Sequence, residues 1–199
     1  MRGQSRTRSI VLCGLSIALL SVGAFVTVPV PFGLTPFTLQ TLMLFIILMI
    51  LTPGEAIVAV AGYLVLGTLG LPIFSGMTGG FAKLVGPTGG FLVGYLVAAL
   101  CVGGIRILLK RHKAVPEKAA ESLRRRIAFD VVMLLFVCLI YFGLGTLWYS
   151  INMGVSLAAA GAACVLPFVV TEPLKIVAAV ACAQPVRSAL GLNVQPERS

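Results

Sequence analysis

The chain has 199 residues, of which 59% are hydrophobic and only 11% charged, and its mean hydropathy is +1.07. In an ordinary soluble domain roughly a quarter of the residues are charged. This composition therefore excludes a water-soluble globular protein and favours helices that use the bilayer as solvent. The formal net charge is +9, but the basic residues lie in connecting segments without interleaved aromatic residues, which argues against a nucleic-acid partner.

Uncharged apolar runs, broken by Pro, Gly or charge clusters, predict an all-α polytopic membrane protein with six transmembrane helices in a single domain. The predicted helices cover residues 9–28, 37–51, 54–70, 89–109, 127–150 and 171–187, with an outer helical segment over 157–163. Each crossing needs about 20 residues, so six crossings nearly use up the chain. No room is left for a soluble catalytic domain.

The basic residues also predict an orientation. Of the 15 Lys and Arg residues, all but Lys83 and Lys175 lie in the N-terminal tail, in the segment 106–126 or in the C-terminal tail. Because Lys and Arg are retained on the cytoplasmic side, both termini are predicted to be cytoplasmic, which requires an even number of spans. Lys83 and Lys175 then fall on the outer half. The predicted location of the protein is the plasma membrane.

Glu172 and Lys175 are charged residues inside an apolar segment, where each costs about 2.5 to 3.5 kcal/mol. At a spacing of three they share one face of a helix. They could form a structural pair that locks the last helix, or they could line a pocket, because charges within a membrane often mark a site.

Two outer connections contain further candidates. The glycine-rich segment 70–90 permits close backbone approach to a ligand and could be a binding lid or a plain connector. It includes Thr88, Gly89 and Gly90 but lacks the lysine of a Walker A motif, so the chain cannot by itself couple ATP hydrolysis. Thr38, Gln40 and Thr41, at the top of the second helix, could bind a solute or face neighbouring helices.

Aromatic and small residues are also ambiguous. Tyr141 and Trp148 could belong to an interfacial aromatic belt or pack against a ligand ring. Gly14 and Ala18 form a small-xxx-small pair, which could serve internal packing or dock a partner helix.

No enzyme is predicted, because no nucleophile, acid–base or metal-ligand grouping is visible, and no cofactor or metal is expected. A secondary transporter of a small organic acid would need an inverted repeat or a second intramembrane carboxylate, and neither is clear. A lipid-modifying enzyme would need a polar cluster near one interface. A purely structural subunit would not need Glu172 and Lys175.

Several motifs resemble the BioY family, the biotin-specific substrate-binding subunits of energy-coupling factor (ECF) transporters. The most specific motif is Gly-Pro-Thr-Gly-Gly at 86–90. It follows a second motif, Gly-Leu-Pro-Ile-Phe at 70–74, whose last residue is Phe74. The others are Val-Gly-Ala-Phe at 22–25, Pro-Phe-Thr-Leu-Gln-Thr at 36–41, Leu-Pro-Phe at 166–168, and Tyr141, Gly145, Leu147 and Trp148.

This resemblance implies a six-helix fold whose solute pocket lies near the outer face, closed by the first loop and by the loop between the third and fourth helices. It implies that biotin is the ligand and that the partners are a transmembrane coupling subunit, which meets Gly14 and Ala18, and two cytoplasmic ATPases. The family usually has Gly-Asp three residues before Lys in the last helix, whereas Thr171-Glu172 precedes Lys175 here. Glu172 and Lys175 are expected to supply the charged contacts, with Thr88, Gly89, Gly90, Gln40, Thr38, Phe74, Tyr141 and Trp148 as further ligand-binding residues.

Overall fold

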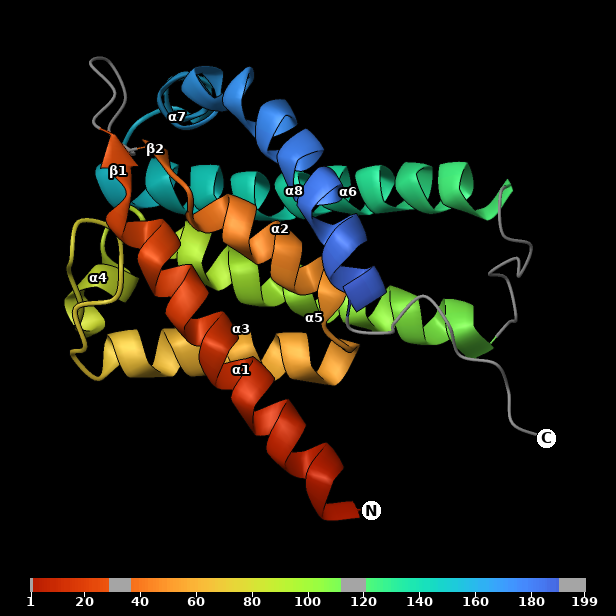
Figure 1. The fold of residues 1–199 in the computed structure, drawn as a ribbon. Helices are drawn as coiled ribbons and strands as arrows, with labels where there is room; N and C mark the ends of the chain where they lie inside the picture. The colour runs from red at the N-terminus through yellow and green to blue at the C-terminus, as the bar shows by residue number, and fades with distance from the viewer. Residues whose placement is uncertain (1, 29–36, 112–120, 190–199) are drawn as a thin grey trace.

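The computed structural model describes residues 2–28, 37–111 and 121–189, and the side chains of residues 6–28, 37–109 and 124–187. It is a helical bundle with one short β-hairpin (Figure 1). The elements in chain order are α1 (Arg2–Phe25), β1 (Thr27–Val28), β2 (Phe37–Thr38), α2 (Gln40–Ile50), α3 (Pro53–Thr68), α4 (Phe81–Val85), α5 (Gly89–Arg111), α6 (Glu121–Met153), α7 (Leu157–Cys164), the 3-10 turn η1 (Leu166–Phe168) and α8 (Thr171–Ala189).

Each predicted helix has a counterpart, but several ends differ. The helix predicted from residue 37 begins at Gln40, because Phe37 and Thr38 pair in antiparallel register with Val28 and Thr27. Such β-branched and aromatic residues suit a short strand pair. The helices predicted over 9–28 and 127–150 begin earlier, at Arg2 and at Glu121. The five-residue helix α4 was not predicted.

The boundary between α2 and α3 is fixed by local chemistry. The Thr52 hydroxyl accepts a hydrogen bond from the Glu55 backbone N–H, and the Glu55 carboxylate accepts one from the Thr52 backbone N–H at 3.1 Å. This capping box, with Pro53 in the first turn, satisfies backbone donors that would otherwise have no partner. The Glu55 carboxylate also accepts a 2.6 Å hydrogen bond from Ser9, which ties α1 to this end of α3.

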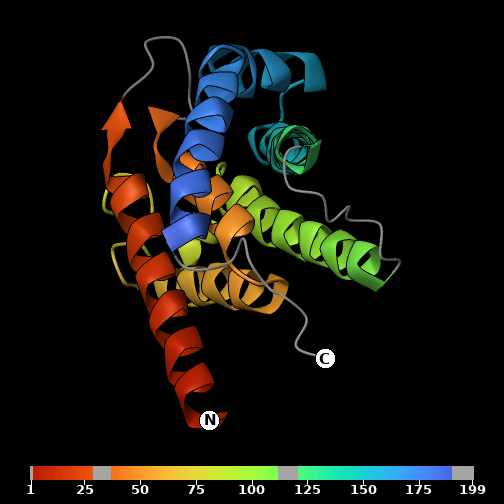
Figure 2. The same cartoon turned by 45° about the vertical axis from the view of Figure 1, so that its right-hand side comes forward.

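Helices α5 and α6 pack side by side, α3 packs against α5, and α8 packs against α2 (Figure 2). The hairpin β1–β2, α4 and α7 gather at one end of the bundle, and the N-terminus lies at the other (Figure 1). One continuous core of buried apolar side chains joins the helices, with Phe45, Tyr63 and Phe74 among its largest fully buried members. The bundle is therefore polarised, with the β-hairpin and the short helices α4 and α7 at one end.

Three described helices are long and apolar enough to cross a membrane, namely α1, α5 and α6. The pair formed by α7 with η1 and by α8 is bent by 45° and would make a fourth crossing if it counts as one span, whereas α2 and α3 are shorter apolar helices. The chain is therefore a multi-pass membrane protein. Helix length alone supports fewer crossings than the six that were predicted.

The end of α2 opposite the pocket is capped by two arginines from other helices. The Arg187 guanidinium donates to the Met49 carbonyl at 2.7 Å and pairs with Asp130 at 2.6 Å. The Arg106 guanidinium donates to the Leu48 and Met49 carbonyls. Cations at a helix C-terminus satisfy its free carbonyls and oppose its dipole. This arginine network, consisting of Arg106, Asp130 and Arg187, connects α2, α5, α6 and α8.

Gly67 lets the outer loop enter the core, because a Cβ at this position would overlap the ring of Phe74. The Phe74 ring is fully buried and stacks edge-on against Tyr63 at 5.4 Å. We expect Gly67→Ala to lower the free energy of unfolding by about 1 to 3 kcal/mol through overpacking, measured by thermal unfolding in detergent. Gly143→Ala is the matched control, since nothing lies within 4 Å of a Cβ there. Equal stability of both variants would contradict the prediction.

Candidate functional site

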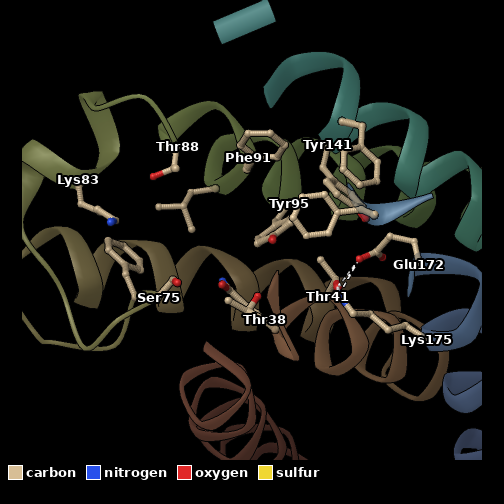
Figure 3. A pocket seen from close by; sticks show the side chains of 15 residues that line it. Thr38, Thr41, Ser75, Lys83, Thr88, Phe91, Tyr95, Tyr141, Glu172 and Lys175 are labelled. Carbon is tan, nitrogen blue, oxygen red and sulfur yellow. Dashed lines mark hydrogen bonds and ion pairs between the residues drawn. The ribbon is translucent and has the colours of Figure 1, made fainter. Parts of the chain in front are cut away.

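A pocket opens at the end of the bundle that carries α4 and the β-hairpin, with about 670 Å³ of empty space including the solvent at its mouth. Figure 3 shows two polar ends, one at Lys83, Ser75 and Thr88 and the other at Thr41, Glu172 and Lys175. The remaining lining residues are Thr38, Gln40, Phe74, Phe91, Leu92, Tyr95, Tyr141, Phe142 and Phe168.

The charged end of the pocket is built from α2 and α8. Lys175 Nζ lies 2.6 Å from Glu172 Oε1 and donates to Thr41 Oγ1 at 2.8 Å, while Thr41 Oγ1 also lies 3.1 Å from the same carboxylate oxygen. The ammonium is 4.3 Å from the centre of the Phe37 ring, a cation–π contact. Both charged residues are only 5% exposed. A buried pair of this kind is stable only when both partners are present.

The Glu172 carboxylate is only half satisfied. Its Oε1 atom contacts Lys175 and Thr41, but Oε2 is buried and has no partner at hydrogen-bond distance among the described residues. The Tyr141 hydroxyl also interacts with this carboxylate. A buried acceptor without a partner is costly. Since Glu172 lines the pocket, this atom is available to a ligand that offers an N–H or O–H donor.

Aromatic rings form one wall of the pocket. Tyr95 from α5 packs edge-on against Tyr141 from α6 at 5.5 Å, and the Phe142 ring lies 6.0 Å from that of Phe168 in η1. Phe91, one helical turn before Tyr95, packs edge-on against Phe142 at 6.3 Å. Aromatic surfaces of this kind hold an apolar ring system with little loss of conformational entropy.

The opposite end of the pocket is polar and lies beneath the outer loop. The Gln40 side-chain amide donates to the Tyr63 hydroxyl at 3.1 Å, which in turn donates to the Ile73 carbonyl at 2.8 Å. Ser75 Oγ is buried without a hydrogen-bond partner among the described residues. Lys83 reaches in from α4, with its amine directed into the pocket (Figure 3).

Comparison with known proteins shows the family of this chain. The model of the BioY family matches residues 1–192. The chain belongs to the BioY family. A probable biotin transporter BioY of Pyrococcus horikoshii is 31% identical over 179 residues, which cover 90% of this chain and 96% of that protein. The biotin transporter BioY2 of Lactococcus lactis is 32% identical, covering 85% of this chain and 84% of the relative.

Two further similarities are limited, the first in the length covered and the second in sequence identity. The biotin transporter BioY of Thermotoga maritima is 41% identical over 96 residues, which is 48% of this chain and 56% of that protein. A crystal structure of the S-component for biotin from an ECF-type ABC transporter has a TM-score of 0.80, with 94% of this chain and 95% of that chain covered. Its sequence identity is 21%, so this likeness shows the fold alone.

In this BioY-family chain, the structure brings seven of the ten predicted ligand-binding residues to the pocket, namely Glu172, Lys175, Thr88, Gln40, Thr38, Phe74 and Tyr141. Gly89, Gly90 and Trp148 are not among its lining residues. A Cβ at Gly89 would meet the Leu84 carbonyl, and one at Gly90 would meet the Trp148 side chain. The two glycines therefore permit close approach of chain segments behind the pocket.

Trp148 forms a hydrogen bond with the outer loop. Its indole N–H donates to the Gly86 carbonyl at 2.9 Å, and the Asn152 side-chain amide donates to the Val85 carbonyl at 2.9 Å. These two hydrogen bonds tie the C-terminal end of α4 to α6. Trp148 therefore positions the segment that carries Lys83.

Gly14 and Ala18 lie on an exposed face of α1, and nothing lies within 4 Å of a Cβ built at Gly14. Internal packing, one of the two interpretations of this pair, is therefore wrong for the described part of the chain. The same face carries the exposed apolar side chains of Ile10, Val11, Leu15 and Val22.

Sequence reasoning missed Ser75, Lys83, Phe91, Leu92, Tyr95, Phe142 and Phe168 in the pocket lining. A usable signal existed for two of them, since Phe91 and Tyr95 stand four residues apart and must share one face of their helix. The other lining residues gave no such signal, because they come together only through tertiary contacts, such as that of η1 with α6.

Proposed function

We propose that this chain is the substrate-binding membrane subunit of a vitamin uptake system that takes biotin from the outer side of the plasma membrane. The observation that carries the proposal is the buried Glu172–Lys175 pair, which lines a pocket with an aromatic wall and leaves Glu172 Oε2 free for a donor. Biotin offers an apolar bicyclic body and ureido N–H groups. Names of relatives at 31–32% identity support this ligand.

The proposal includes six spans, cytoplasmic termini and a single transmembrane domain. The concentration of Lys and Arg in the tails and in the segment 106–126 supports the orientation. The pocket lies at the end of the bundle away from the N-terminus, which agrees with uptake from outside. Cysteine labelling from each side of the membrane, at introduced positions in the tails and in the outer loop, tests this topology.

The energy for transport is proposed to come from partners. An ECF transmembrane coupling subunit would dock on the exposed Gly14 and Ala18 face of α1 and carry two cytoplasmic ATPases. The chain itself is neither an enzyme nor dependent on a cofactor or metal in this proposal. Copurification of the complete complex would support the partnership, and robust biotin uptake into liposomes by the lone chain would instead favour a self-sufficient secondary transporter.

Equilibrium titration of the detergent-purified protein with biotin, alongside other vitamins, tests the ligand. Tight and selective binding of biotin is expected. A folded protein that binds none of the biotin offered, or binds unrelated vitamins equally well, would contradict the proposal. Folding is checked independently by the thermal unfolding transition.

Removing the tie between α4 and α6 is expected to speed biotin release. In the variant Trp148→Phe, Asn152→Ala, the Gly86 and Val85 carbonyls lose their donors, each contributing about 1 kcal/mol. We expect the dissociation rate to rise by up to about thirtyfold, measured by chasing labelled biotin with unlabelled biotin. Ile151→Ala is the control on the same stretch of α6, because its side chain is exposed. Unchanged release from the double variant would show that the tie is irrelevant.

A further inference from the structure

We propose that Lys83 binds the carboxylate of the ligand, so that the substrate lies with its anionic tail under α4 and its N–H donors against Glu172. This assignment rests on the proposed function and adds the direction in which the ligand lies. It also gives the outer loop a charged contact with the substrate, whereas sequence reasoning treated only the two charges of the last helix as charged contacts.

Lys175 is the obvious alternative, but its surroundings argue against it. Its ammonium already contacts Glu172 Oε1 at 2.6 Å, Thr41 Oγ1 at 2.8 Å and the face of Phe37. A ligand carboxylate placed there would meet the Glu172 carboxylate in a buried setting, where like charges repel strongly. Lys175 therefore serves to hold the Glu172 side chain in position.

Lys83 has the opposite surroundings. The three carboxylates with described side chains are engaged elsewhere: Glu55 with Ser9 and Thr52, Asp130 with Arg187, and Glu172 with Lys175. Lys83 forms no ion pair with any of them, is half-buried, and directs its amine into the pocket (Figure 3). A cation without an ion-pair partner that faces a pocket is poised for an anionic ligand group.

The charge of the pocket lining fits a singly charged anion. The lining contains two lysines and one glutamate, so its formal charge is +1. The Glu172–Lys175 pair is neutral as a unit, which leaves the charge of Lys83 uncompensated. One carboxylate on the ligand would neutralise the site.

Two of the four buried side-chain polar atoms without a partner among the described residues belong to the pocket lining, and they define the same direction. Glu172 Oε2 is an acceptor at one end of the pocket, and Ser75 Oγ is a hydroxyl that can donate, on the outer loop near Lys83 (Figure 3). A carboxylate beside Lys83 accepts from both the ammonium and the hydroxyl, and N–H donors at the far end satisfy Glu172. The reverse orientation would set carboxylate against carboxylate and leave Lys83 facing N–H donors.

The test pairs a protein variant with a ligand variant. Dissociation constants are measured for biotin and for its uncharged carboxamide with the wild-type protein, Lys83→Gln and Lys83→Arg. We expect the wild type to prefer the acid by roughly tenfold or more, as for a charge-assisted hydrogen bond. Lys83→Gln should lose that preference while still binding the amide, and Lys83→Arg should retain it. Arg124→Gln removes the same charge from an exposed position in the first turn of α6 and should behave as the wild type.

The outcomes separate the two proposals. Full acid preference in Lys83→Gln, or no acid preference in the wild type, would overturn the assignment of Lys83 while biotin binding stands. Failure of the folded wild type to bind either compound would overturn the proposed function and this assignment together. Loss of the preference in Arg124→Gln as well would show a general effect of net charge and would also overturn the assignment.

Discussion

Replacing Lys175 with alanine is expected to abolish measurable biotin binding and to destabilise the protein. The substitution leaves the Glu172 carboxylate 5% exposed and without its counterion, which costs about 3 to 5 kcal/mol for a buried pair. The Glu172 side chain would then lose the contact that holds it in place, so the carboxylate that faces the pocket would no longer be positioned for a ligand. Glu172→Gln is expected to weaken binding by about 2 to 4 kcal/mol, as at a binding hot spot. Titration with labelled biotin measures both variants.

The double variant Glu172→Gln, Lys175→Met separates binding from stability. It removes both charges, so its unfolding temperature should recover toward that of the wild type, because a buried pair can be replaced by neutral side chains at little cost. Its biotin affinity should stay low, since the ionised acceptor is still missing. Wild-type affinity in Lys175→Ala would refute the site, and low stability of the double variant would show that the pair is also needed for folding.

Asp130→Ala is expected to cause the largest loss of stability away from the pocket. Asp130 is buried and accepts two hydrogen bonds from the Arg187 guanidinium, at 2.6 and 3.2 Å. Without it, Arg187 keeps only the Met49 carbonyl, and the free energy of unfolding should fall by about 3 to 5 kcal/mol. Thermal unfolding in detergent measures the loss.

The control for this prediction is the joint variant Asp130→Asn, Arg187→Gln. It removes both charges but retains hydrogen-bonding groups, so it should be more stable than Asp130→Ala. Some loss should remain, because the Met49 carbonyl loses its charged donor. An unfolding temperature of Asp130→Ala equal to that of the wild type would show that the arginine network contributes nothing to stability.

Much of this arrangement could be predicted from the sequence, because the bilayer restricts the structures that a long apolar segment can form. Long uncharged runs can only be helices in hydrocarbon, so the positions of α1, α5 and α6 followed directly. Glu172 and Lys175 were identified for the same reason, since charges in such a run require a partner or a cavity. The extra starting turns of α1 and α6 contain charged residues and therefore lay outside the apolar pattern.

The parts that could not be predicted depend on tertiary contacts. Phe142 is an aromatic residue within an apolar run, and its sequence context is the same whether it faces lipid, core or ligand. The sequence also does not show that Gly89 and Gly90 permit the close approach of Leu84 and Trp148. α4 has only five residues, too few for a periodic signal, so Lys83 could be placed on the outer half but not in the pocket.

The shortness of α2 gives the bundle two different hydrophobic lengths. Its 11 residues span about 16 Å at 1.5 Å per residue, against about 30 Å of hydrocarbon, whereas the 23 residues of α5 reach about 35 Å. No residue of α2 is exposed, because the neighbouring helices cover it. Hydrophobic mismatch therefore acts on the outer helices, which can tilt to suit a thicker or thinner bilayer. The covered helix keeps the pocket and the arginine network at a fixed separation, so the depth of the site is set by the protein and is independent of the lipid.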